Sequence, residues 1–181
     1  TINFKGEKMI LFIRHGQTDC NVKKIIQGQL DAPLNQKGLE QAELTAQKLK
    51  DFKIDEIYAS PLSRARQTAE VVNKFHRVPI ICDDRLKEQN AGDATGMSEH
   101  DVTKEMYEDF MRDPHKYHAE SPADLYQRNA DFARTLNDQN KTILIVAHRG
   151  NFSMLTRYFQ NLSLDDKTDK IENCEIKILK N

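Results

Sequence analysis

Two short apolar runs, far apart in the chain, each end at a histidine beside an arginine. Residues 9–13 read MILFI and continue into Arg-His-Gly at 14–16, and residues 142–147 read TILIVA and continue into His-Arg-Gly at 148–150. Unbroken apolar runs of this length, rich in β-branched residues, are typical of strands buried on both faces of a parallel sheet. Since ligands bind at the carboxyl ends of such strands, both histidine-bearing ends are candidate site positions.

Weaker patterns between these runs complete an alternation of strands and helices. Residues 54–59 and 79–82 are predicted to be further strands, and 174–179 alternates in the manner of an edge strand. Apolar residues at helical spacing predict helices in the intervening segments. This alternation predicts one α/β domain over residues 1–181, with a mostly parallel central sheet and helices on both faces.

Serine-containing signals predict where three of the helices begin. Ser60-Pro61 and Ser121-Pro122 each read as an N-cap followed by the first helical residue, and Ser98-x-x-Asp101 resembles a capping box. The polar stretch 89–120 is interrupted by two glycines and a proline. We expect it to form a partly helical flap near the edge of the sheet that carries the histidines.

The overall charge excludes several classes of partner. The 181 residues include 27 basic and 28 acidic side chains, a formal charge of −1. Proteins that bind nucleic acid or membrane surfaces usually carry a clear basic excess, and no run approaches the ~18 apolar residues of a membrane span. The three scattered cysteines form no CxxC, so neither a disulfide framework nor a zinc site is indicated. With no signal-peptide pattern, we expect a cytoplasmic protein.

The first triplet has side chains suited to phosphoryl chemistry. Arg14 is of the type that binds phosphate bidentately and keeps its charge, and His15 can act as a covalent nucleophile through a ring nitrogen. Gly16 allows a tight turn and close backbone approach to a ligand. Taken alone, the triplet is equally well explained by a strand-capping histidine beside a surface arginine.

Five separated motifs decide between these interpretations. They are RHGQTDCN at 14–21, GQLDAPLNQKGLEQA at 28–42, SPLSRARQTA at 60–69, RLKEQNAGDATG at 85–96 and VAHRG at 146–150. In this order and spacing they closely resemble the histidine phosphatase superfamily, the phosphoglycerate mutase-like family. The resemblance runs from about residue 9 to residue 155 and implies the phosphoglycerate mutase-like form of the α/β fold.

The resemblance implies a role for each of five residues. His15 matches the nucleophile that becomes phosphohistidine, and Arg14 and Arg64 match the two arginines that hold the phosphoryl group. His148 matches the second histidine of the phosphate pocket, and Glu88 the proton donor to the leaving group. Two arginines and two histidines suit a phosphoryl group, because its charge is spread over three oxygens.

Chemistry adds two expectations about individual groups. His15 has to attack as a neutral imidazole, so its other ring nitrogen needs a hydrogen-bond acceptor, for which a backbone carbonyl is the natural choice. A protonated Glu88 can donate to the departing alkoxide and later take a proton from water. Arg64 is near the start of a predicted helix, where free N–H groups favour an anion.

Residues further from the reacting groups are expected to bind substrate. Asn21 aligns with a phosphate-pocket asparagine of the family, and Gln27 and Gly28 fall in a loop that often touches substrate. Arg149 is included as a substrate-binding residue, although it departs from the family, in which glycine is frequent after the second histidine. It either adds an anion contact or points to solvent. Gln17 and Ala94-Thr95 also depart from the family pattern, and these departures leave the leaving-group pocket undefined.

We expect a phosphoric monoester hydrolase of the histidine acid phosphatase type, acting on a small phosphorylated metabolite without a cofactor or metal. Phosphoglycerate mutase-type transfer is the alternative, and a non-catalytic module that binds a phosphorylated ligand is a third. His115 and His118 have the spacing of a metal pair, but no nearby cysteine or carboxylate pattern completes a site. The sequence decides neither the physiological substrate nor the oligomeric state.

Overall fold

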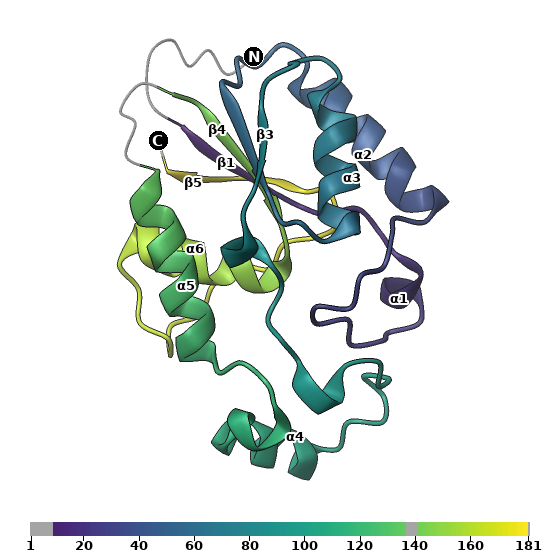
Figure 1. Ribbon diagram of the computed structural model, residues 1–181, viewed down its shortest axis with the longest axis vertical. Coiled ribbons are helices and arrows are strands. Elements are labelled where there is room, and N and C mark those ends of the chain that lie inside the picture. The colour runs from purple at the N-terminus through teal and green to yellow at the C-terminus, as the bar shows by residue number, and fades with distance from the viewer. Residues whose placement is uncertain (1–8, 137–140, 181) are drawn as a thin grey trace.

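The computed structural model describes residues 9–136 and 141–180, and within those ranges a five-stranded sheet forms the centre of a single α/β domain. The strand order is β3-β2-β4-β1-β5, and the first four strands along this order run parallel (Figure 1). β5 pairs antiparallel with β1 and forms an edge, as its alternating sequence predicts. The strands are β1 (Ile10–Arg14), β2 (Glu56–Ala59), β3 (Ile80–Cys82), β4 (Ile143–Ala147) and β5 (Ile176–Lys180).

Helices cover both faces of this sheet. α2 and α3 lie together on one face, and α5 and α6 pack against each other on the opposite face (Figure 1). α4 lies apart from the sheet, on the flap (Figure 1). The helices are α1 (Asp19–Val22), α2 (Gln36–Leu49), α3 (Ser63–Asn73), α4 (Lys104–Arg112), α5 (Pro122–Thr135) and α6 (Arg149–Gln160). No helix in the described ranges is long and apolar enough to cross a membrane.

Strand β1 shows how the two halves of the core form. Its side chains alternate across the sheet. Ile10 and Phe12 join the core beneath α5 and α6, whereas Leu11 and Ile13 join the core beneath α2 and α3. All four are buried, which explains why the run is apolar at every position instead of at alternate ones.

The strand order brings the two histidine-bearing ends together. β1 and β4 are direct neighbours, paired in register from Ile10 with Ile143 to Arg14 with Ala147. The His15 backbone N–H then donates to the Ala147 carbonyl at 2.9 Å. Both histidines therefore leave the sheet at the same carboxyl edge, as expected from the two apolar runs.

Two of the three predicted helix starts are wrong. α3 begins at Ser63, with Leu62 as its N-cap and no capping side chain, because the Ser60 hydroxyl is used elsewhere in the site. α4 begins at Lys104 and is capped by Thr103, whereas Ser98 forms an isolated bridge with Ile25. The start at Ser121-Pro122 is confirmed, with a complete capping box between Ser121 and Asp124.

The flap at 89–120 is partly helical, as predicted. It contains α4 and two short 3-10 turns, Gly92–Ala94 and Pro114–Tyr117. α4 has no buried residue, and its main packing partner in the flap is the second of these turns. The flap therefore stands at the edge of the domain that carries the histidines, away from the core of the sheet (Figure 1).

Candidate active site

A cavity of about 970 Å³ opens at the carboxyl edge of β1. Arg14, His15, Arg64, Glu88 and Arg149 are among the residues that line it. Residues of the flap line it as well. Four of the five residues expected to carry the chemistry thus line one cavity, although they come from three separate segments of the chain.

His15 is buried and held in one orientation. Its Nδ1 lies 2.7 Å from the carbonyl oxygen of Gly16, which fits an Nδ1–H donor and leaves the Nε2 lone pair free. Burial lowers the pKa of His15 well below its ordinary value, and the nearby Arg64 charge lowers it further. The ring is therefore neutral at physiological pH. The predicted backbone acceptor for its second nitrogen is present.

Gly16 allows the turn after β1 to approach helix α2 closely. Its N–H donates to the Thr68 hydroxyl at 3.0 Å, and that hydroxyl donates to the Arg64 carbonyl. A Cβ at Gly16 would lie 2.5 Å from the carbonyl oxygen of Gly38 in α2. Because that neighbour is backbone, any side chain here would displace the segment that carries His15.

Backbone carbonyls fix Arg64 and Arg14, and each guanidinium keeps a buried Nε–H that has no partner among the described residues. Arg64, the second residue of α3, donates to Leu30 at 2.7 Å and to Gly28 at 2.9 Å. Arg14 donates to Ile171 at 3.0 Å. Desolvation lowers the pKa of both groups, so an anion in the cavity would relieve an electrostatic cost.

His148 lies beside His15 but does not form part of the cavity lining. Its ring centroid is 5.1 Å from that of His15, and it is completely buried at the start of α6. Burial and the charge of Arg64 lower its pKa well below the ordinary value. Nε2 is 2.9 Å from the Ser60 hydroxyl, and Nδ1 has no partner in the part of the chain described.

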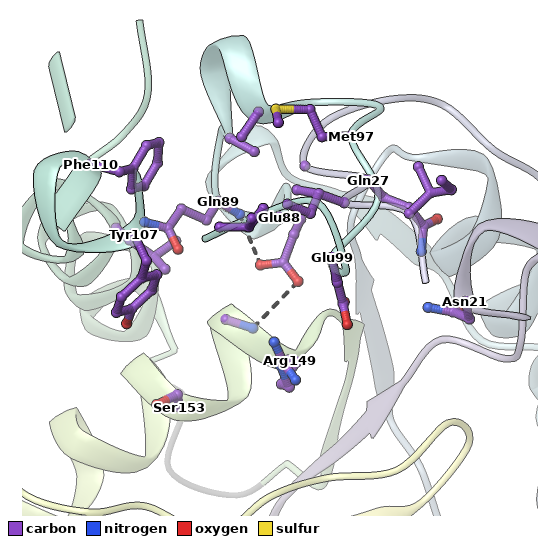
Figure 2. Close-up of a pocket in the computed structure, with 18 of the residues that line it drawn as sticks. Asn21, Gln27, Glu88, Gln89, Met97, Glu99, Tyr107, Phe110, Arg149 and Ser153 are labelled. Carbon is purple, nitrogen blue, oxygen red and sulfur yellow. Dashed lines mark hydrogen bonds between the residues drawn. The ribbon is translucent and has the colours of Figure 1, made fainter. Parts of the chain in front are cut away.

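Glu88 projects into the cavity from the loop after the 3-10 turn Asp84–Leu86. One carboxyl oxygen accepts from the Gln89 N–H at 2.8 Å, and the other accepts from the Gly150 N–H at 3.4 Å (Figure 2). A Cβ at Gly150 would lie 2.3 Å from the carboxylate. The glycine after Arg149 therefore makes room for the acid.

Arg128 of α5 holds the Glu88 loop, and sequence reasoning did not identify it. Its guanidinium donates to the carbonyls of Lys87 at 2.7 Å and Glu88 at 3.0 Å, and to that of Arg85. It also forms an ion pair with Glu120. Within the α5 sequence Arg128 looks like a solvated helix position, because the carbonyls that it binds come from a segment 40 to 43 residues away.

The predicted substrate-binding residues line the cavity, but three of them also support other groups. Asn21 and Gln27 both place an oxygen 3.1 Å from the Thr18 hydroxyl. Gly28 has φ +47°, and its carbonyl accepts from Arg64. Their structural role is thus to hold the loop that fixes Arg64.

Arg149 points into the cavity and not away from it (Figure 2). Its guanidinium is exposed and makes no hydrogen bond or ion pair with the residues that the structure describes. Its charge contributes to the lowered pKa of Arg14. A third free cation near the two pocket arginines adds to the attraction for an anion.

The wall opposite the arginines is largely apolar. The flap supplies Met97, Met106, Tyr107 and Phe110. The last three lie on α4, and Tyr107 and Phe110 are on the side of the cavity toward which the Glu88 carboxyl projects (Figure 2). Outside this cavity, His115 lies 3.3 Å from Asp124. His118 lies 3.1 Å from Asp93. The two histidine rings thus have separate carboxylate partners, and no group of three metal-binding side chains occurs in residues 9–136 and 141–180.

Comparison with known proteins gives consistent results. The family model described as the histidine phosphatase superfamily (branch 1) matches residues 10–181. The chain is 38% identical over 141 residues to "Uncharacterized phosphatase PhoE" of Bacillus subtilis, covering 77% of this chain and 70% of that protein. It is 33% identical over 147 residues to phosphoserine phosphatase 1 of Hydrogenobacter thermophilus, with the same two coverages. The structure of a mycobacterial glucosyl-3-phosphoglycerate phosphatase in complex with VO3 matches with a TM-score of 0.84 and 25% identity, covering 94% of this chain and 90% of that one.

Proposed function

The chain belongs to the histidine phosphatase superfamily, and on that premise we propose that it hydrolyses a small phosphomonoester through a phosphohistidine on His15. One observation carries the proposal. The Nδ1–H of His15 is held by the Gly16 carbonyl, so a neutral imidazole presents its free Nε2 lone pair beside the buried Arg64 and the half-buried Arg14. A phosphoryl group is the ligand that such an arrangement of nucleophile and cations would take.

The unused donors supply the phosphate pocket. The Nε–H groups of Arg14 and Arg64 are buried and have no acceptor in the described residues. The three equatorial oxygens of a transferring phosphoryl group would supply acceptors, with the charge spread over them. Because these donors are already fixed by the backbone, they need little reorganisation during the reaction.

The first chemical step transfers the phosphoryl group to the enzyme. The Nε2 lone pair of His15 attacks phosphorus, and an N–P bond forms as the bond from phosphorus to the ester oxygen breaks. The electron pair of that bond stays on the oxygen. The protonated carboxyl of Glu88 gives its proton to this oxygen, so a neutral alcohol leaves and Glu88 becomes a carboxylate.

The second step returns the enzyme to its starting state. The Glu88 carboxylate takes a proton from water, and the resulting hydroxide oxygen attacks phosphorus. The N–P bond breaks, its electron pair returns to Nε2 of His15, and inorganic phosphate leaves. Glu88 is protonated again and ready for the next ester.

The finer class we propose is the histidine acid phosphatase type. Desolvation and the Arg64 charge depress the pKa of His15. The imidazole therefore stays neutral and nucleophilic below pH 6.5, where an ordinary histidine is protonated. Hydrolysis is expected to continue into the acid range, where a solvent-exposed histidine would be protonated and could not attack.

The apolar flap wall points to the kind of alcohol released. The ester oxygen must lie near Glu88, and the space beyond Glu88 is bounded by Met106, Tyr107 and Phe110. These side chains would bury an apolar or aromatic leaving group better than a polyol. Among small phosphomonoesters we therefore expect aryl phosphates to be good substrates.

Trapping the phosphoenzyme tests the proposal. The wild-type protein, quenched during turnover of p-nitrophenyl phosphate in EDTA, should carry phosphate that is labile in acid and stable in base. His15→Ala should carry none and should lose turnover by a factor of at least about 10³, as for removal of a covalent nucleophile. Label that persists in His15→Ala would disprove the nucleophile.

The same experiment separates the alternatives. Phosphoenzyme that transfers its group to an added phosphoglycerate, with slow release of inorganic phosphate, would favour the mutase. Tight phosphate binding with no turnover on any monoester would favour the non-catalytic module.

A further inference from the structure

Ser60 lies where it can control the second histidine. It follows β2 directly, and its N–H donates to the Val146 carbonyl at 3.0 Å, two residues before His148. Its side chain is fully buried, with the hydroxyl oxygen 2.9 Å from Nε2 of His148. This backbone bond holds the segment of Ser60 beside the segment that leads into His148.

The hydrogen-bond partners of the Ser60 hydroxyl determine which way its proton points. The Leu62 N–H donates to this oxygen at 3.3 Å. The hydroxyl has one proton of its own, and Nε2 of His148 is its remaining hydrogen-bond partner among the described residues. Ser60 therefore donates to Nε2, which must be the unprotonated nitrogen of the ring.

A neutral imidazole with an unprotonated Nε2 carries its proton on Nδ1. That Nδ1 is buried without a partner in the described chain. The ring centroids of His148 and His15 are 5.1 Å apart. Buried N–H groups are rarely left without an acceptor, because the loss costs about 1–3 kcal/mol. In this tautomer the Nδ1–H of His148 is a third unsatisfied buried donor near His15, in addition to the Nε–H groups of Arg14 and Arg64.

We propose that Ser60 is a positioning residue that fixes His148 in the Nδ1–H tautomer and so offers this N–H to a phosphoryl oxygen. The inference rests on the proposed function for the identity of that acceptor. In the opposite tautomer both Nε2–H and Leu62 N–H would donate to Ser60. The serine proton would then have no acceptor, and an Nδ1 lone pair would face the phosphoryl oxygens.

Nitrogen NMR of the wild-type protein tests the tautomer without any activity measurement. Protonated and unprotonated ring nitrogens have well-separated ¹⁵N shifts, and the His148 signals can be assigned by their absence in His148→Asn. We expect a protonated Nδ1 and an unprotonated Nε2 at pH 7. A protonated Nε2 would overturn the proposal, whether or not the protein hydrolyses esters.

Variants test the consequence for catalysis. Ser60→Ala should give a mixture of tautomers and lower kcat/KM about tenfold, as expected for one weakened charge-assisted hydrogen bond. Ser60→Thr, which keeps the hydroxyl, should restore the single tautomer and most of the activity. Ser63→Ala is the matched control, because the Ser63 hydroxyl bonds Asp31 outside the histidine pair. Unchanged tautomer in Ser60→Ala, with or without loss of activity, would show that the serine is merely structural.

Discussion

At the scale of single residues, the proposed nucleophile and the proposed proton donor lie in different environments. Desolvation keeps His15 neutral, so its lone pair is available for attack. Glu88 receives two backbone N–H groups and stands in a cavity that is open to solvent. The nucleophile and the proposed acid therefore differ in environment, the usual way in which one site assigns separate roles to titratable groups.

Glu88→Gln tests the acid through the leaving group. An alkyl alcohol leaves poorly without a proton, whereas p-nitrophenolate leaves readily as an anion. We expect kcat/KM to fall by about 10²–10⁴ for an alkyl phosphate, and much less for p-nitrophenyl phosphate. Steady-state kinetics on both esters measure this ratio. Equal losses for both esters would mean that Glu88 only positions the substrate.

At the scale of elements, the sequence identifies the sheet better than the helix starts. The two apolar runs predict β1 and β4, because burial on both faces demands apolar residues at every position. Ser60 was assigned wrongly as a cap because its partner, His148, lies 88 residues away. A local capping pattern contains no information about a hydrogen-bond partner so distant in the sequence.

The same reasoning applies to the candidate site. The motifs point to the proposed nucleophile, both arginines and the proposed acid, since each belongs to a short, recognisable segment. Arg128 belongs to none of them, and only the folded chain shows that it holds the Glu88 loop. Likewise, the burial of His148 beside His15, outside the cavity lining, follows from packing at the start of α6.

Helix α4 offers a matched pair of methionines to test the leaving-group wall. Met106 lines the cavity, whereas Met111, on the same helix, does not; they are 44% and 41% exposed. Met106→Ala should lower kcat/KM for 1-naphthyl phosphate about fourfold, equivalent to roughly one buried methylene group. The same variant should change kcat/KM for glycerol phosphate little, because glycerol has no apolar group to contact this side chain.

Met111→Ala should leave both substrates unaffected and so controls for a general loosening of the flap. If the two variants behave alike, the wall does not contact the alcohol.

At the scale of the whole molecule, the net charge hides a strong local asymmetry. A chain with a charge of −1 concentrates Arg14, Arg64 and Arg149 around one cavity. Such a concentration attracts small anions, because the cavity focuses the electric field of the arginines. The overall charge balance gives no basic excess that would bind an extended polyanion. Burying neutral histidines among these cations also makes stability depend on pH.

Stability is expected to fall as the solution is acidified. His15 and His148 have pKa values below the ordinary 6.5 in the folded chain and near 6.5 when unfolded. Below pH 6.5 the unfolded chain binds more protons than the folded chain. The free energy of unfolding therefore decreases as the pH is lowered, by up to about 1.4 kcal/mol per pH unit for each ring. Urea unfolding between pH 7 and pH 5 measures this slope.

His15→Asn and His148→Asn should each reduce the slope, whereas His100→Asn, an exposed position on the flap, should not. A slope that persists unchanged in both buried variants would assign it to other groups.

The ion pair of Arg128 has a consequence for how such a domain changes its chemistry. This one guanidinium binds the carbonyl of Glu88, where the flap begins, and the carboxylate of Glu120, where it ends. Both ends of the flap are thereby bound by one side chain of α5, and the segment between them can be replaced without moving its ends. Grafting another flap between the bound ends would give the same nucleophile and phosphate pocket a different alcohol to release.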